Sequence, residues 1–376
     1  MKKSILLLFL TSFIYGSLAA QPVMPMPAKM VEGPQRFSLD RSFYVVIQNN
    51  PSERVALAAK SFLCRLNEQT HLMTPVTIES GIKKSAGIYL IIKYQRAGAL
   101  IPGEDESYQL NVTGDQMMLE AETDLGIMHG LETVLQLVQS DEKGYYLQGV
   151  TINDRPRFTW RGLLIDVCRH WMPMEVIKRN IDGMAMVKLN VLHLHLSDDQ
   201  GFRVESKSLP KLHLLGSDGN YFTQEQIREI IRYAGDRGIR VVPEFDMPGH
   251  ASSWMCGYPE LASAKGPYAV ETKFGVFDPA INPTAKKTYK IIGKLIGEMS
   301  QLFPDPYFHI GGDENNGKQW DANPDIRSFM KKHQLKDNHA LQQYFNEHLM
   351  SILKKNGDRK STRLNSSHIP LSRMPS

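Results

Sequence analysis

A strand, a loop and a helix follow one another four times between Arg157 and Gly357, and this repeat limits the possible folds more than any other feature. The strands lie in WRGLLIDVCRH, VLHLHLSDDQGFR, IRVVPEFDMPGH and YFHIGGDE, and a helical pattern such as MPMEVIKRNIDGMAMVKLN follows each of them. Such βα units in series form a parallel sheet, which is either open and doubly wound or closed into a barrel. No glycine-rich phosphate loop follows the first strand, which argues against a dinucleotide-binding sheet.

The residues before this repeat show a mixed pattern. FYVVI and GIYLIIKY are typical of buried strands, and YQLNVTGDQMMLEAET predicts a hairpin that turns at Thr113-Gly114-Asp115. SERVALAAKSFLCRLNEQT and GIMHGLETVLQLVQ have apolar residues at helical spacing. Strands covered by helices on one side predict a small α+β domain over residues 21–150, which precedes the βα region of residues 156–357.

The first residues predict export. Lys2 and Lys3, an apolar run and the small residues before Gln21 are typical of a cleaved signal peptide over residues 1–20. Gln21 stands where a lipoprotein would carry a cysteine, so we expect a periplasmic or secreted protein that is not inserted in the membrane after cleavage. The three cysteines, Cys64, Cys168 and Cys256, are scattered and predict neither a disulfide framework nor a zinc site.

The last residues do not continue the helical pattern before them. Residues 358–376 begin with DRKSTRLNSSH, which matches the in-frame translation of a common sequencing adapter, so we interpret them as a non-native tail. The genuine sequence would then leave the fragment near Gly357 and continue in a longer parent protein. Without the leader and the tail, 38 basic residues face 39 acidic ones, and the formal charge of +4 disappears. Charge therefore gives no support to a nucleic-acid or anionic-membrane partner.

Each of the four strands ends in polar residues, which a parallel sheet would gather at one face. His193 and His195 are two positions apart, so their side chains lie on the same face of their strand. Paired histidines can bind zinc, but the nearby acids outnumber them, so we favour a hydrogen-bonded core pair and expect no cofactor. The strand-end residues are Asp166, Arg169 and His170; His195, Asp198 and Asp199; Glu244, Asp246 and His250; and Asp313 and Glu314.

Four sequence blocks, RGLLIDVCRHW, KLNVLHLHLSDDQGFR, RGIRVVPEFDMPGH and HIGGDE, resemble the conserved blocks of glycoside hydrolase family 20, the β-N-acetylhexosaminidases, in that family's order. The resemblance covers about residues 22–357. It implies the first half of a (β/α)8 TIM barrel preceded by a small α+β domain. Because the family barrel has eight strands and this chain has four, we expect activity in the complete parent and none in the fragment.

The resemblance also implies a mechanism. Asp313 and Glu314 are sequence neighbours, so they are badly placed to flank one glycosidic bond as the two carboxyls of an ordinary glycosidase do. Substrate-assisted catalysis removes this difficulty, because the 2-acetamido oxygen of the sugar attacks the anomeric carbon. Glu314 would be the general acid and then the base, and Asp313 would orient the acetamido group. We expect the charge of Asp313 to raise the proton affinity of Glu314.

The remaining roles follow from the same resemblance. Asp198 and His250 would set the protonation of Glu314, and Arg169 would hold sugar hydroxyls. Gly311 and Gly312 would let the backbone pass close to the sugar, and Trp320 would either line a subsite or pack in the core. The expected activity is exo-acting, retaining removal of N-acetylglucosamine or N-acetylgalactosamine from oligosaccharides or glycoconjugates. Two alternatives are a catalytically inactive carbohydrate-binding protein and a metal-dependent TIM-barrel hydrolase built on His193 and His195.

Overall fold

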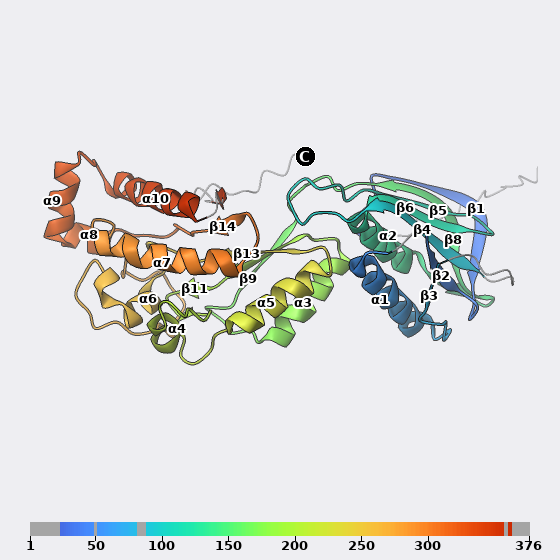
Figure 1. The fold of residues 1–376 in the computed structure, drawn as a ribbon, viewed down its shortest axis with the longest axis horizontal. Helices are drawn as coiled ribbons and strands as arrows, with labels where there is room; N and C mark the ends of the chain where they lie inside the picture. Colours follow the sequence, from blue (N-terminus) through green and yellow to red (C-terminus); the bar gives the residue numbers. More distant parts are fainter. Residues whose placement is uncertain (1–22, 49–50, 81–87, 357–359, 363–376) are drawn as a thin grey trace, which may run out of the picture.

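The computed structural model describes residues 23–48, 51–80, 88–356 and 360–362. Two sheets, each with its own hydrophobic core, lie side by side along the longest axis (Figure 1). The predicted leader and most of the predicted tail lie outside the described residues. Within the described part, no helix is both long and apolar enough to cross a membrane.

The N-terminal sheet is mixed, with the strand order β1-β8-β5-β6-β4-β2-β3 and β7 beside β8. The predicted hairpin is confirmed as the antiparallel pair of β5 and β6. In β5, Tyr108, Leu110 and Val112 are buried and alternate with two exposed polar residues, as expected of a sheet with one covered face. The strands are β1 (Lys29–Leu39), β2 (Tyr44–Ile47), β3 (Ile78–Glu79), β4 (Tyr89–Arg96), β5 (Tyr108–Val112), β6 (Met117–Thr123), β7 (Gln139–Asp141) and β8 (Gly144–Asp154).

Helices α1 (Glu53–Thr70) and α2 (Asp124–Leu137) cover one face of this sheet (Figure 1), which confirms the predicted α+β arrangement. Helix α1 begins after Ser52, whose side chain accepts a hydrogen bond from the backbone N–H of Val55 at 3.2 Å. Helix α2 packs very closely, because a Cβ added at Gly126 would lie 2.1 Å from the carbonyl oxygen of Ser107. Glycine is therefore required at this position by contact distance.

The second sheet is parallel, with the order β9-β10-β13-β14-β15. A long helix follows each of the first four strands, so the four predicted βα units are confirmed. The strands are β9 (Gly162–Asp166), β10 (Val191–His195), β13 (Arg240–Glu244), β14 (Tyr307–His309) and β15 (Lys360–Thr362). The helices are α3 (Met174–Met186), α5 (Gln224–Gly235), α7 (Lys286–Leu302) and α10 (Asn338–Lys355).

Shorter elements occupy the loops at the carboxyl ends of the strands. The two-stranded ribbon β11 (Ser197–Asp198) and β12 (Gly201–Phe202) follows β10, and helix α4 (Lys211–Gly216) comes after it. Helix α6 (Ser252–Gly257) follows β13, whereas α8 (Lys318–Ala322) and α9 (Pro324–Lys332) follow β14. Strand β15 lies in the segment that the sequence assigns to a non-native tail, and the origin of that segment stays a prediction.

A buried lysine joins the two domains. Lys188, between α3 and β10, is 4% exposed, and its Nζ donates to the hydroxyls of Tyr108 and Thr133 at 2.9 and 2.8 Å. The same ammonium lies 3.3 Å from Oδ2 of Asp154 at the end of β8. Burial lowers the pKa of Lys188, although the charge of Asp154 opposes this effect. The Lys188 side chain, which belongs to the second domain, therefore forms polar contacts with residues of the N-terminal domain.

A second polar contact lies at the same boundary. The Glu106 carboxylate, before β5, forms an ion pair with Arg161 and accepts a hydrogen bond from Asn190 Nδ2 at 2.8 Å. His129 of α2 has its pKa lowered to about 3 by burial and by the nearby charges of Arg161 and Lys188, so its ring is neutral at pH 7. These groups hold the N-terminal sheet against the start of β9 and β10.

Candidate active site

A row of ionisable side chains crosses the parallel sheet at the carboxyl ends of its strands. Asp166 of β9, His195 of β10, Glu244 of β13 and His309 of β14 are register partners from one strand to the next. Side chains at matched register in neighbouring parallel strands point to the same face. All except Asp166 are buried. The expectation that polar strand ends gather at one face is therefore confirmed.

Three imidazoles surround the Glu244 carboxylate. Its Oε2 lies 2.6 Å from Nε2 of His193 and 3.0 Å from Nδ1 of His195, and its Oε1 lies 2.9 Å from Nδ1 of His309. Burial raises the pKa of Glu244, but its contacts with the three histidines outweigh burial and hold this pKa far below its usual range. His193 and His195 thus face the same carboxylate, which confirms the predicted core pair.

The same cluster bears on the metal alternative. Donor atoms of His193, Glu244 and His309 lie within 4.8 Å of one another, as do those of Asp198, Asp199 and His250. In each group the histidine nitrogens already face a carboxylate of the same group, as the contacts of Glu244 and of His250 show. The geometry therefore favours the core pair over the metal-dependent alternative.

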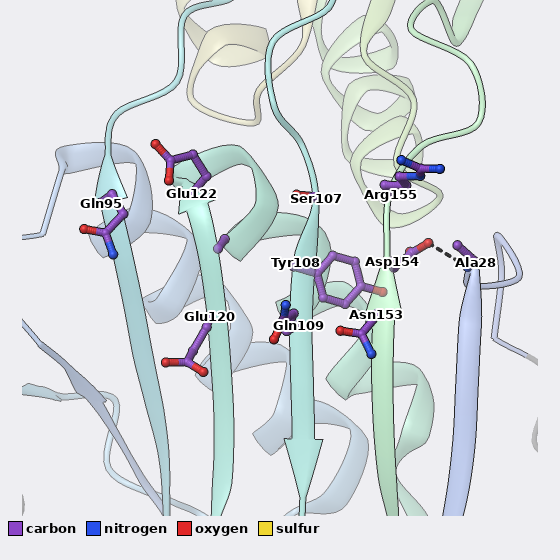
Figure 2. Close-up of a pocket in the computed structure, with 11 residues that line it drawn as sticks. Ala28, Gln95, Ser107, Tyr108, Gln109, Glu120, Glu122, Asn153, Asp154 and Arg155 are labelled. Carbon is purple, nitrogen blue, oxygen red and sulfur yellow. Dashed lines mark hydrogen bonds between the residues drawn. The ribbon is translucent and has the colours of Figure 1, made fainter.

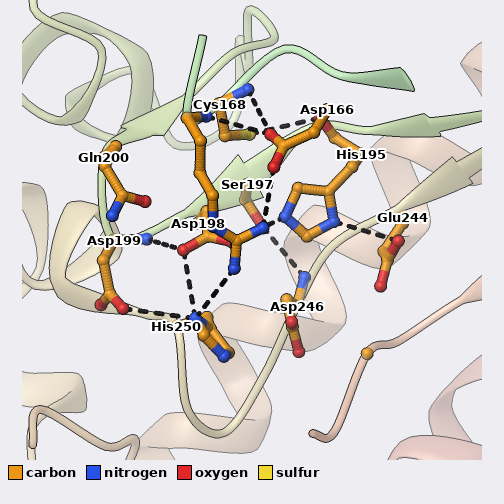
Figure 3. Close-up of polar contacts among 12 residues, drawn as sticks. Asp166, Cys168, His195, Ser197, Asp198, Asp199, Gln200, Glu244, Asp246 and His250 are labelled. Carbon is orange, nitrogen blue, oxygen red and sulfur yellow. Dashed lines mark hydrogen bonds and ion pairs between the residues drawn. The ribbon is translucent and has the colours of Figure 1, made fainter. Parts of the chain in front are cut away.

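The predicted relay of Asp198, His250 and Glu314 is brought together in the structure. Nδ1 of His250 lies 3.2 Å from Oδ1 of Asp198, and its Nε2 lies 3.4 Å from Oε2 of Glu314. Figure 3 shows Asp198 between His195 and His250. Burial lowers the pKa of His250, but hydrogen bonds to Asp198 and Asp199 more than offset it and raise this pKa to about 11.

Arg169 lies at the rim of the same cluster. Its Nη1 donates to Oδ2 of Asp166 at 2.7 Å, and its Nη2 lies 2.7 Å from Oδ2 of Asp198. The side chain is 30% exposed, so part of the guanidinium faces the surface while its other part is paired. The structure places Arg169 beside the relay, whereas its contact with sugar hydroxyls stays a prediction.

The loop after β14 presents the carboxylate pair. Gly311 and Gly312 adopt φ angles of 62° and 109°, and Glu314 adopts a φ of 49°. A Cβ at Gly311 would lie 1.7 Å from Oδ1 of Asp246, and that same oxygen accepts the backbone N–H of Gly312 at 2.8 Å. The expectation that Gly311 makes room for a sugar needs correction, because a buried carboxyl of the protein already occupies the space beside it. For Gly312 the expectation stays a prediction.

Asp246 is a strand-end residue to which the sequence analysis assigned no role. It is 2% exposed, and its polar atoms lie within 4.8 Å of those of His250 and Asp313. Burial raises its pKa well above the usual range, and the like charges of Asp313 and Glu244 act in the same direction. The charge of Asp313 therefore acts on Asp246, and its expected effect on Glu314 stays a prediction. The PEFDMPGH block contains this residue, but only the folded chain shows what it faces.

The structure decides between the two roles predicted for Trp320. The side chain is fully buried in a small cluster with Ala280, Ile326 and Leu341, and its Nε1–H donates to the carbonyl oxygen of Ile281 at 3.0 Å. It therefore packs under the loop after β14 and does not line a subsite.

A separate hollow of 430 Å³ lies on the open face of the N-terminal sheet (Figure 2). Gln95, Gln109, Glu120 and Asn153 line it from four neighbouring strands, together with Arg155 just beyond β8. None of the predicted site residues borders it. Its polar lining is that of a solvent-facing sheet surface, so the candidate active site remains at the carboxyl ends of the parallel strands.

The architecture is a small mixed-sheet domain followed by a parallel α/β sheet with carboxyls at its strand ends. The family model "Glycosyl hydrolase family 20, catalytic domain" matches residues 158–363, and "Glycosyl hydrolase family 20, domain 2" matches residues 20–155. The chain belongs to glycosyl hydrolase family 20. The predicted domain order is thus the order of the two family models.

Known proteins agree with this assignment. A β-hexosaminidase of Porphyromonas gingivalis is 33% identical over 90% of this chain and 44% of its own length. The β-hexosaminidase subunit beta of Homo sapiens is 43% identical over 61% of this chain and 41% of its own length. The Flavobacterium johnsoniae chitobiase structure has a TM-score of 0.86 and 46% identity, covering 90% of this chain and 52% of that one. The chain thus spans about half the length of these relatives.

Proposed function

We propose that the complete protein is an exo-acting β-N-acetylhexosaminidase. It removes terminal N-acetylglucosamine or N-acetylgalactosamine with retention of configuration, by substrate-assisted hydrolysis. The single observation that supports this most strongly is the contact chain from Glu314 through His250 to Asp198, with Asp313 next to Glu314 in the chain. A similar exo-β-N-acetylglucosaminidase from Vibrio harveyi, at 31% identity, was solved in complex with N-acetylglucosamine.

The first chemical step needs one acid and one orienting carboxylate. The 2-acetamido oxygen attacks the anomeric carbon while Glu314 protonates the departing glycosidic oxygen, and the bond between that carbon and oxygen breaks. Asp313 accepts the acetamido N–H and stabilises the positive charge of the oxazolinium. The Glu314 side chain is 35% exposed whereas that of His250 is 1% exposed, so substrate reaches the carboxyl and not the imidazole behind it.

The second step reverses the roles. Glu314, now a carboxylate, takes a proton from a water molecule as the water oxygen bonds to the anomeric carbon. The oxazolinium ring opens, the acetamido group is restored, and the sugar keeps its β-configuration. In this step His250 lies beside the Glu314 carboxylate through its Nε2, and Asp198 lies beside the other ring nitrogen of His250.

We place the enzyme in the periplasm or outside the cell, because Lys2, Lys3 and the apolar run that follows them have the composition of an export leader. The substrates would be oligosaccharides or glycoconjugates that end in an N-acetylhexosamine. The other barrel strands and pocket residues would come from the complete parent, so the fragment alone is expected to be inactive.

A matched pair of substrates tests the proposal. The complete protein is assayed on an aryl β-N-acetylglucosaminide and on the aryl β-glucoside that lacks the acetamido group. We expect turnover of the first only, because the second carries no attacking amide oxygen. Equal rates on both substrates would refute substrate assistance, and binding without turnover would identify the silent carbohydrate-binding alternative. Activity that chelators abolish would point instead to the metal-dependent alternative.

A further inference from the structure

Glu244 lies below the catalytic rim and has no role in the mechanism above. It is 5% exposed, on the strand between β10 and β14, and is the register partner of both His195 and His309. Through His195 it is connected to the relay, because one ring nitrogen of His195 faces Glu244 and the other faces Asp198.

The geometry at His195 determines its charge. Nδ1 lies 3.0 Å from Oε2 of Glu244, and Nε2 lies 2.8 Å from Oδ2 of Asp198. A carboxylate only accepts hydrogen bonds, and a neutral imidazole donates only one. Both contacts can be hydrogen bonds only if both nitrogens carry a proton, which is the arrangement of an imidazolium. Burial lowers its pKa, but hydrogen bonds to Asp198 and Glu244 outweigh this and raise the pKa to about 10.

The imidazolium in turn fixes Asp198. Oδ2 of Asp198 contacts both His195 and Arg169, at 2.8 and 2.7 Å. Oδ1 accepts the backbone N–H of Asp199 at 2.6 Å and faces His250 at 3.2 Å. Both carboxylate oxygens therefore have polar contacts, and Oδ1 is the oxygen that faces His250.

Other ionisable groups also surround His195. Asp246 lies on its catalytic side, and Asp166 and Cys168 lie on the side of β9, with donor atoms within 4.8 Å of the His195 ring. Asp166 forms an ion pair with Arg169, and the pKa of Cys168 is raised by burial, so this thiol is neutral. Among these neighbours, only Glu244 contacts Nδ1 directly as a carboxylate.

We propose that Glu244 is a positioning residue of the catalytic relay: it keeps His195 doubly protonated, and His195 then holds Asp198 in the orientation that His250 and Glu314 require. The relay would run as Glu244–His195–Asp198–His250–Glu314, with acid and base alternating from the sheet interior to the surface. This inference rests on the proposed function for its kinetic consequence, whereas the protonation of His195 does not depend on it.

The test compares Glu244→Gln with His193→Gln in the complete protein. Glu244→Gln alters the contacts of this carboxylate with His193, His195 and His309. His193→Gln removes one contact of the same cluster and leaves the contact between Glu244 and His195 in place. Nitrogen-15 NMR of labelled histidine reports the ring protonation, with the His195 signal assigned from a His195→Gln sample. The wild-type ring should stay doubly protonated at pH 8. In Glu244→Gln its titration should move down by about two pH units or more.

Kinetics complete the test. We expect Glu244→Gln to lower kcat by about 10- to 100-fold with little change in KM, whereas His193→Gln should keep kcat within about threefold of wild type. A neutral His195 in the wild-type protein at pH 7, or equal kcat losses in the two variants, would overturn the proposal. The wild-type spectrum alone decides the protonation of His195, even if Glu244→Gln does not fold. An inactive wild-type protein with a doubly protonated His195 would refute the proposed function alone.

Discussion

In the N-terminal sheet, polar side chains such as Gln109 and Asn111 stand on the open face and alternate with buried Leu110, whereas in the parallel sheet His195, Glu244 and His309 lie buried side by side. The first arrangement separates apolar from polar residues by strand alternation, at no electrostatic cost. The second removes charges from water, which is unfavourable unless each charge meets a partner. The residue pattern of the N-terminal sheet therefore favours stability. The strand ends of the parallel sheet instead hold ionisable side chains of the kind that a chemical reaction requires.

The greatest change in activity should come from the parallel sheet. Replacement Glu314→Gln in the complete protein removes the acid and should lower kcat by about 10²- to 10⁴-fold, because proton transfer contributes that much in enzymes that use it. The matched change on the other sheet is Glu120→Gln, at a partly exposed position of β6 that pairs with Lys93 at 3.5 Å. Steady-state assays should show no loss in that variant. Comparable losses in both variants would contradict this division of roles between the two sheets.

The boundary between the domains gives the next effect in size. Lys188→Met removes the ammonium that Tyr108, Thr133 and Asp154 share, and leaves the Asp154 carboxylate without its cation. We expect a loss of about 3 kcal/mol in the free energy of unfolding, since breaking a largely buried pair leaves an uncompensated charge. Urea unfolding followed by tryptophan fluorescence and far-UV circular dichroism would measure it. Lys93→Met on the exposed face should cost less than about 1 kcal/mol; equal losses would contradict the boundary role.

The close packing of α2 provides a test of the N-terminal domain in which stability and activity are measured separately. Gly126→Ala would place a methyl group 2.1 Å from the Ser107 carbonyl oxygen, and the backbone must move to relieve the clash. We expect a loss of about 1–3 kcal/mol, measured by thermal unfolding, with kcat of the remaining folded enzyme unchanged. A fall in kcat at full folding would mean that the N-terminal sheet takes part in the chemistry.

A change in helix α3 should have a small effect of the opposite sign. Gly183 lies in the interior of α3, is exposed, and has no atom within 4 Å of the position that a Cβ would take. Gly183→Ala should therefore stabilise the protein by about 0.5–1 kcal/mol, because alanine loses less backbone entropy in a helix. The thermal midpoint should rise slightly; a decrease would show that the helix contacts something at this position.

Periodicity was sufficient to predict most of the fold. The hairpin of β5 and β6 and the four βα units follow from local spacing. Strand β1 was missed because Gly33 and Pro34 interrupt it, and its register with β8 shifts between Glu32 and Arg36. An irregular, largely exposed strand carries no clear alternation.

The sequence motifs predicted the main residues of the candidate site. The contacts among the other residues could be found only from the register of neighbouring strands. Glu314, His250 and Asp198 are far apart in the sequence, yet the family blocks pointed to each of them. The positions of Glu244 and Asp246 within the cluster could not be inferred, because they depend on which residues of neighbouring strands lie opposite one another. The backbone N–H of Gly312 that binds Asp246 is likewise visible only in three dimensions.

His250 and Glu314 share a left-handed backbone, with φ angles of 51° and 49°. Such a conformation costs a residue with a side chain about 1–2 kcal/mol, a penalty that glycine avoids. If only the backbone contribution to folding stability were under selection, glycine would thus be favoured at both positions. In a related protein that has lost its substrate, we expect these two positions to be substituted early. Glycine at either position would then indicate that the catalytic function has been lost.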